Sequence, residues 1–232
     1  MLENKIKNSY LYGFIEKDGP DKKALVGKEL YPDHLQSSTT IRSIKLWVGS
    51  PNGKNEIKTI LGIQLKYVNY ITGLKKETDY QGAPIEGMDI DVLDLEIKEG
   101  DYLSKINIGF DEYINHLKFT TLKEDNVEFG KINEQTEKNS VADINSDKNV
   151  ILNIRGYYSK NGIRAIGFNY ISFKDFCFIR WIDLLRLRHK CKDEEYKKSL
   201  EEKINNYNNV EKCFYRTCTF PEIIFAKILS YV

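Results

Sequence analysis

Hydrophobic and polar residues alternate along most of the chain between about residue 41 and about residue 173. A repeat of two residues is typical of β-strands that bury one face. The alternation predicts these inward-facing side chains: Ile44, Leu46 and Val48; Leu93, Leu95 and Ile97; Leu117, Phe119 and Thr121; Val150, Leu152 and Ile154; and Ile166, Phe168 and Tyr170. So many short strands indicate an all-β barrel, sandwich or prism.

Turn signals separate these runs. Proline and glycine occur together at residues 50–53 and 82–84, and Asn161-Gly162 is the dipeptide that most strongly favours a hairpin turn. Residues 131–149 are polar and carry few large apolar groups, so we expect one long exposed loop there between two strands.

After Phe173 the apolar repeat changes to about 3.6 residues, the period of an α-helix. The segment FCFIRWIDLLRLRHK is apolar on most of its circumference, which in a soluble protein indicates burial against the β domain or a partner. We therefore predict a β domain over residues 1–173, a helical extension over residues 174–232, and a protein partner bound by the extension. The predicted docking residues are Phe176, Ile179, Trp181, Ile182 and Leu185.

The rest of the extension predicts one or two more helices. One stripe of the segment DEEYKKSLEEKINNY holds Tyr196, Leu200, Ile204 and Tyr207, as expected of an amphipathic helix. The final TFPEIIFAKILSYV starts with proline in a first turn and faintly resembles the opening helix of an F-box. That resemblance implies an adaptor for a degradation machine, as an alternative to an ordinary amphipathic helix.

Composition narrows the class of protein. The chain has 232 residues, of which 41% are hydrophobic, enough for a substantial core. A formal net charge of +1 gives no field that would attract nucleic acid. The opening MLENKIKNSY lacks the apolar run of a secretory signal, and no segment has the roughly 20 apolar residues of a membrane span. We expect an intracellular protein with no membrane span and no nucleic-acid partner.

Few residues indicate bond-making chemistry or metal binding. The four cysteines Cys177, Cys191, Cys213 and Cys218 all lie in the last quarter of the chain, and His189 lies beside one of them. A zinc site formed by His189, Cys191, Cys213 and Cys218 is a weak candidate, because the spacings match no familiar ligand pair. Disulfide pairing is another alternative, but small buried thiols are the simplest interpretation. No nucleophile elbow, phosphate loop or metalloprotease helix is present, so we expect no enzyme and no cofactor.

The order of the strand motifs resembles that of the jacalin-related lectin domain family. The matching pieces are Ile63-Gln64-Leu65-Lys66-Tyr67, Leu117-Lys118-Phe119-Thr120-Thr121, Phe129-Gly130 and Ile166-Gly167-Phe168-Asn169-Tyr170. The resemblance covers most of residues 10–173, and the helical extension has no counterpart in it. It implies a mainly β fold, the β-prism I of three four-stranded antiparallel sheets.

The resemblance also implies a sugar site, from which this chain departs. In the family a glycine-rich N-terminal loop and a Gly-x-x-x-Asp loop hold the sugar, and the aspartate accepts hydrogen bonds from two hydroxyls. Aligned on Ala165-Ile166-Gly167, the aspartate position holds Arg164 and the glycine position holds Lys160. A guanidinium has only donors, so it cannot replace that acceptor. Near the N-terminus only the isolated Gly13, Gly19 and Gly27 are found.

Two functions follow from these observations. The first is a non-enzymatic binding or structural module whose usual sugar site is degraded, with Arg164 as an exposed strand residue, acting in an assembly through its helices. The second is an intracellular lectin with rearranged loops, in which Ser159 or Asn161 accepts hydrogen bonds or Arg164 binds an anionic sugar. The residues of this candidate carbohydrate loop are Gly156, Tyr157, Ser159, Lys160, Asn161 and Arg164.

Overall fold

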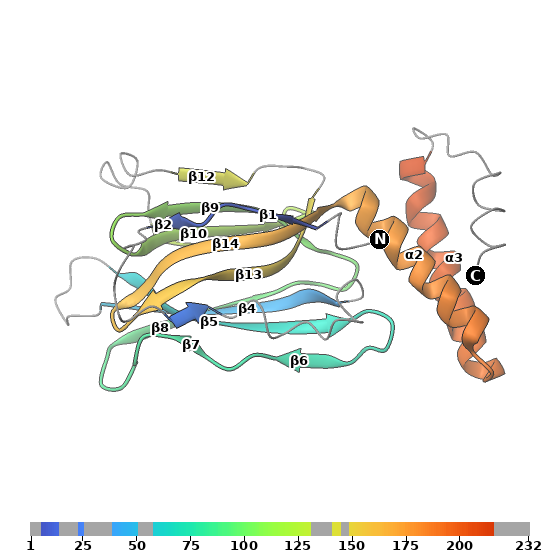
Figure 1. The fold of residues 1–232 in the computed structure, drawn as a ribbon, viewed down its shortest axis with the longest axis horizontal. Coiled ribbons are helices and arrows are strands. Elements are labelled where there is room, and N and C mark those ends of the chain that lie inside the picture. The colour runs from blue at the N-terminus through green and yellow to red at the C-terminus, as the bar shows by residue number, and fades with distance from the viewer. Residues whose placement is uncertain are drawn as a thin grey trace. The chain divides into compact units, whose positions relative to one another are not determined.

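The computed structural model describes residues 6–13, 23–25, 39–50, 58–130, 141–144 and 149–215. The chain divides into two compact units, Met1–Phe176 and Cys177–Val232, which we name the β unit and the helical unit. Within the described residues, the β unit contains three antiparallel sheets of five, four and five strands (Figure 1). In each five-stranded sheet, four strands form the main order and the fifth is a short strand paired beside it. The predicted β-prism of three four-stranded sheets is therefore confirmed.

The first sheet is centred on a long hairpin of β13 (Asn149–Ser159) and β14 (Gly162–Ser172). The short strands β1 (Lys7–Asn8) and β2 (Tyr12–Gly13) pair with β14, and β3 (Lys23–Leu25) pairs with β13. Ser159 and Gly162 face each other across the turn, as the Asn161-Gly162 signal predicts. The turn brings the candidate loop residues to one end of the sheet.

The second sheet has the order β11-β10-β9-β12. Its strands are β9 (Leu103–Phe110), β10 (Ile114–Thr121), β11 (Asn126–Phe129) and β12 (Val141–Ile144). The prediction of one continuous loop over residues 131–149 is therefore wrong at β12, which pairs with β9 along the sheet edge. Four residues are too few to display an alternating pattern, and the pairing rests on backbone groups that the sequence does not reveal.

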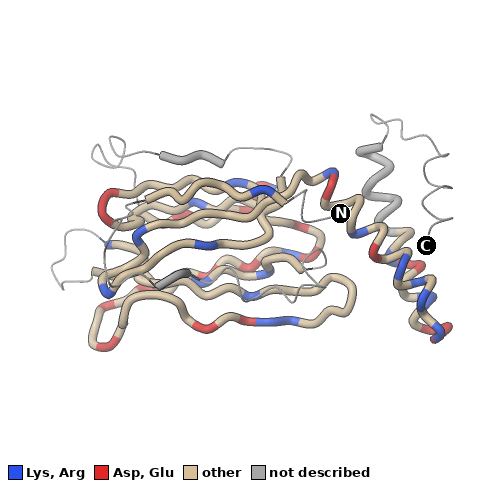
Figure 2. The backbone as a smooth tube through the Cα atoms, in the orientation of Figure 1, with Lys and Arg blue, Asp and Glu red and all other residues tan. Residues whose placement is uncertain are grey.

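The third sheet is built on β4 (Thr39–Gly49) and β5 (Thr59–Asn69), which pair along most of their length. Strand β8 (Ile90–Glu96) borders β4, while β6 (Lys75–Glu77) and β7 (Gln81–Gly82) border β5. Charged residues of both signs are interspersed along the strands, in keeping with the near-neutral net charge (Figure 2).

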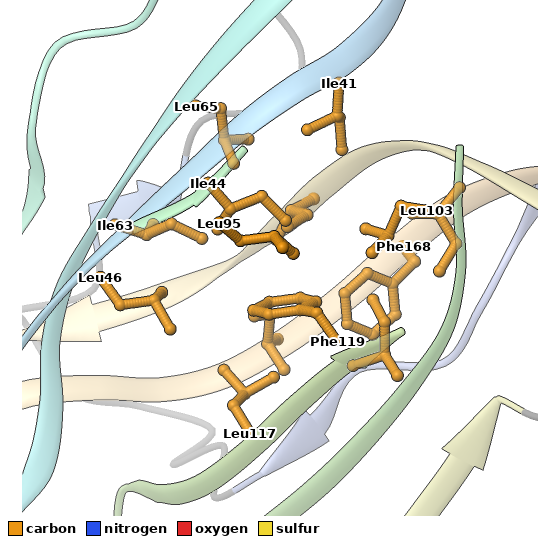
Figure 3. Close-up of a cluster of buried hydrophobic side chains, with 14 of the residues drawn as sticks. Ile41, Ile44, Leu46, Ile63, Leu65, Leu95, Leu103, Leu117, Phe119 and Phe168 are labelled. Atoms are coloured by element: carbon orange, nitrogen blue, oxygen red, sulfur yellow. The ribbon is translucent and has the colours of Figure 1, made fainter. Parts of the chain in front are cut away.

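All three sheets supply side chains to one hydrophobic core (Figure 3). The alternation correctly predicts which side chains of β4 face this core, since Ile44, Leu46 and Val48 are each 1% exposed. On β13 the predicted Val150, Leu152 and Ile154 are buried too, but Ile151 between them is also buried, and the pairing with β14 shifts register between Ile151 and Asn153. Such a bulge inserts an extra residue and changes the face of the side chains that follow.

The bulge on β13 alters which residues reach the core. Ile151 and Ile154 belong to the core cluster, whereas the predicted Val150 and Leu152 are buried outside it. Next to the bulge, the Asn153 side chain accepts a hydrogen bond of 2.5 Å from the Tyr67 hydroxyl. Both residues are almost fully buried, so this bond joins the first and third sheets inside the core.

Helix α2 (Phe173–Lys190) begins directly after β14. Ser172 caps it, because its hydroxyl accepts from the Asp175 N–H at 3.0 Å and donates to the Asp175 carboxylate at 2.7 Å. Phe176 is only 2% exposed, and its ring packs edge-on against Tyr102 at 5.0 Å between centroids. The prediction that Phe176 docks on a partner is therefore wrong, because this ring is buried within the β unit against Tyr102.

Helix α3 (Glu194–Tyr215) is capped by the preceding Asp193. The Asp193 Oδ1 accepts from the N–H groups of Glu195 and Tyr196, both at 2.9 Å. Leu200 and Ile204 are buried as predicted, but Tyr196 is 39% exposed. The side chain of Tyr207 and the segment 219–232, including the F-box resemblance, lie outside the described residues. Neither described helix is long and apolar enough to cross a membrane.

Candidate functional site

Two hairpin ends meet at one end of the β unit. One is the β9–β10 connection, residues 111–113, and the other is the β13–β14 turn with the start of β14, residues 159–164. The Asn161 side-chain N–H donates to the Tyr113 hydroxyl at 3.2 Å, and the Arg164 Nη2 donates to Glu112 Oε1 at 2.8 Å. We name these two segments together the hairpin end.

Asp111 shapes the β9–β10 connection. Its Oδ1 accepts from the Tyr113 N–H at 3.1 Å, and its Oδ2 accepts from the Asn115 amide at 3.0 Å. Local bonds of this kind are typical of aspartate in tight turns. Because both oxygens of Asp111 serve the turn, the neighbouring Glu112 is the more accessible carboxylate, with 58% of its side chain exposed.

Arg164 is more enclosed than predicted. Only 18% of its side chain is exposed, and its guanidinium carbon lies 5.4 Å from the centre of the Tyr113 ring. With the Glu112 ion pair, this stacking holds the guanidinium between two residues of the other hairpin. The expectation of an exposed strand residue is therefore wrong, because residues 112 and 113 reach the same end from elsewhere in the chain and cover Arg164.

Other members of the candidate loop divide into two groups. Lys160 is exposed at the turn, and Ser159 accepts from the Asn161 N–H at 3.2 Å, so these residues do form a loop with Asn161. Gly156 and Tyr157, however, are strand residues of β13 that pair on both sides, with β14 and with β3. Their assignment to the loop is wrong, because they lie within β13, before Ser159 at its end.

Gly13 lies beside the hairpin end. It pairs with Ala165, and its φ of +131° is a conformation that side chains rarely adopt. A Cβ at Gly13 would lie 2.1 Å from the Arg164 carbonyl oxygen, so only glycine fits. Gly19 and Gly27 lie outside the described residues. Sequence reasoning noted Gly13 but missed residues 111–113, because no sequence signal connects Glu112 with Arg164.

Of the four weak metal candidates, only His189 and Cys191 have described side chains. His189 is exposed at the end of α2, and Cys191 donates from its thiol to the Asp193 carbonyl at 3.3 Å. The side chain of Cys213 and all of Cys218 lie outside the described residues. Among the described residues, no three His, Cys, Asp or Glu side chains are grouped so as to hold a metal.

His116 is a buried histidine that contacts a glutamate on the neighbouring strand. It is 2% exposed on β10, and its Nε2 lies 3.1 Å from Glu128 Oε1 on β11. Hydrogen bonds from His116 and then from Lys118 lower the pKa of Glu128. These contacts join neighbouring strands, so we interpret them as sheet contacts. His34 lies outside the described residues.

Comparison with solved structures shows the fold. Calystegia sepium agglutinin matches with 15% identity and a TM-score of 0.50, covering 72% of this chain and 96% of its own. Calsepa lectin in complex with a biantennary N-glycan matches with 16% identity and the same coverage and TM-score. Artocarpin complexed with Me-alpha-mannose matches with 13% identity, a TM-score of 0.50, and coverage of 72% and 98%. A comparison with curated proteins finds no match.

A family model connects the sequence with these folds. The model for the jacalin-like lectin domain matches residues 28–169, which include most of the three sheets and residues 111–113 and 159–164. Helices α2 and α3 lie outside the match. Because the match extends over more than half of the sequence, the chain belongs to the jacalin-like lectin domain family.

Proposed function

We propose that this chain is a non-enzymatic carbohydrate-binding module whose ligand site is the hairpin end. The observation that supports this is the convergence of two hairpins, in which Asn161, Arg164, Glu112 and Tyr113 form one hydrogen-bonded group. Two fold neighbours were solved with carbohydrate ligands, a biantennary N-glycan and Me-alpha-mannose. The ligand class of the proposal follows from the family, and its location from the side chains.

The hairpin end offers the groups that a sugar requires. A sugar hydroxyl both donates and accepts hydrogen bonds, so a binding site needs acceptors and donors close together. Glu112 is an exposed acceptor, Lys160 is an exposed donor, and Tyr113 adds a partly exposed ring with a polar hydroxyl. The acceptor expected from the family is absent at position 164, so binding here would use a different set of residues from the usual one.

The test is a glycan array probed with the full-length chain and with Tyr113→Ala. The wild type is expected to bind, and Tyr113→Ala to weaken binding at least about tenfold, because the mutation removes the ring and the hydroxyl that hold Glu112 and Asn161. Tyr196→Ala, at a partly exposed tyrosine in the helical unit, is the matched control and should bind as the wild type does. A wild-type chain that binds no glycan contradicts the proposal.

A second candidate function is protein docking through the helical unit. Ile179, Trp181, Ile182 and Leu185 on α2 are partly exposed, and their spacing keeps Ile179, Ile182 and Leu185 close to one helix face. Apolar side chains that stay partly exposed on one face of a helix favour association with another surface. The absence of the usual carboxylate at position 164 is consistent with this candidate. If the β unit does not bind sugar, the helices would carry the function.

Charge reversal tests the docking candidate. Leu185→Glu is expected to abolish association or to alter solubility while the β unit stays folded, because it places a charge on the apolar face. Arg186→Glu, a charge reversal at the next and exposed residue, is the matched control. Light scattering after size-exclusion chromatography measures association, and thermal unfolding reports on the β unit. Equal association and solubility in Leu185→Glu and the wild type would rule out docking through this face.

A further inference from the structure

The hairpin end contains a carboxylate close to the position where the family keeps its own. In this chain Arg164 occupies that position, and its Nη2 donates to Glu112 Oε1 at 2.8 Å. The acid therefore comes from the β9–β10 connection, 52 residues away in sequence, while the arginine occupies the strand. An arginine thus stands where the resemblance implies an aspartate, and the carboxylate that it contacts comes from the other hairpin.

The contacts of Glu112 leave part of its carboxylate available. Its Oε1 accepts from Arg164 Nη2 at 2.8 Å and from the Tyr113 hydroxyl at 3.1 Å. Both hydrogen bonds that Glu112 accepts from the described residues thus reach the same oxygen, while the side chain is 58% exposed. Oε2 remains able to accept hydrogen bonds from a ligand.

The residues around Glu112 hold it in place. The Tyr113 hydroxyl donates to Glu112 and accepts from the Asn161 amide at 3.2 Å, so three residues from two hairpins fix one carboxylate. A carboxylate held in one geometry loses less conformational entropy when a ligand binds. Arg164 is mostly enclosed, and it is held by Glu112 and the Tyr113 ring.

We propose that Glu112 is a relocated acceptor for the hydroxyl groups of a neutral saccharide, with Arg164 as the positioning residue. This inference rests on the proposed function and names its ligand class. Within residues 111–113 and 159–164, the formal charges of Asp111 and Glu112 balance those of Lys160 and Arg164, so these described residues provide no surplus of positive charge for an anionic sugar. Hydroxyl groups that donate to Oε2 need no such surplus.

The experiment is a quantitative array of neutral, sialylated and uronic-acid glycans, probed with the full-length wild type and Glu112→Gln. Wild-type binding is expected to be confined to neutral glycans. Glu112→Gln should weaken it about tenfold or more, because hydrogen bonds to a charged acceptor are the stronger ones. Glu99→Gln is the matched control and should bind normally, because this exposed glutamate precedes β9 and residues 111–113 follow that strand at its other end.

Arg164 variants test its positioning role. Arg164→Gln is expected to weaken binding, and Arg164→Lys to restore most of it, because one ammonium can replace the single Nη2 contact with Oε1. A role limited to packing predicts no such rescue. Thermal unfolding should be unchanged in Glu112→Gln, whose side chain is largely exposed.

The outcomes separate the two proposals. If the wild type binds no glycan, both are contradicted. If the wild type binds and Glu112→Gln binds equally well, or if the wild type prefers anionic glycans, the relocated acceptor is wrong while carbohydrate binding stands. Two results together support the assignment. Glu112→Gln loses the binding of neutral glycans, and Arg164→Lys binds them much more strongly than Arg164→Gln does.

Discussion

Phe119→Ala is expected to lower the free energy of unfolding of the β unit by about 4 kcal/mol. Phe119 lies on β10, is 0% exposed, and points into the core that all three sheets share (Figure 3). Truncation removes the buried ring and leaves a cavity that the surrounding strands, tied to one another by backbone hydrogen bonds, cannot close.

Denaturant unfolding followed by tryptophan fluorescence measures this loss. The chain has two tryptophans, and Trp47 lies in the β unit while Trp181 lies in the helical unit. A Trp181→Phe background therefore assigns the signal to the β unit. Val92→Ala is the control, because Val92 is 52% exposed and its truncation should change stability by about 0.5 kcal/mol or less. Similar losses in the two variants would contradict the shared core.

Gly13→Ala is expected to destabilise the β unit by about 3 kcal/mol and to detach β2 from β14. Two effects add: the backbone angle of +131° strains any side chain, and the new Cβ would lie 2.1 Å from the Arg164 carbonyl oxygen. The backbone fixes the position of a Cβ, and the atom that it would meet is a backbone oxygen, so no side-chain rotation relieves the clash. The pairing of Gly13 with Ala165 should therefore be lost.

Gly73→Ala separates the two effects. Gly73 has a positive φ of +71°, but a Cβ there would meet nothing within 4 Å. It should cost only the conformational strain, about 1 kcal/mol. Unfolding free energies, with amide hydrogen exchange at Ala165 and Ile166, measure the comparison. Equal costs for the two variants, with unchanged exchange on β14, would show that the close approach of β2 is unimportant.

The strand content and the core were largely predictable from the sequence. Ile44, Leu46 and Val48 alternate because one face of β4 is buried, and burial of apolar area acts on each strand locally. On β13 the bulge near Asn153 decides which of the buried residues join the core cluster, namely Ile151 and Ile154. Alternation alone does not reveal a bulge, because the same residues fit either face until the partner strand selects a register.

The helical extension shows the same limit. The periodicity predicts the two described helices, and the Ser172 and Asp193 caps are local features of the sequence. The environment of Phe176 is not local. Its burial depends on Tyr102, a residue of the β unit far away along the chain.

The sequence by itself determined the family resemblance, the strand and helix content, and the absence of the usual acid at position 164. These properties depend on the order and spacing of residues along the chain. Only the tertiary structure decided that Arg164 is enclosed by Tyr113 and paired with Glu112, and that Gly13 approaches its carbonyl oxygen. The physical reason is that these contacts join separate hairpins and strands, which only sheet pairing and core packing bring together.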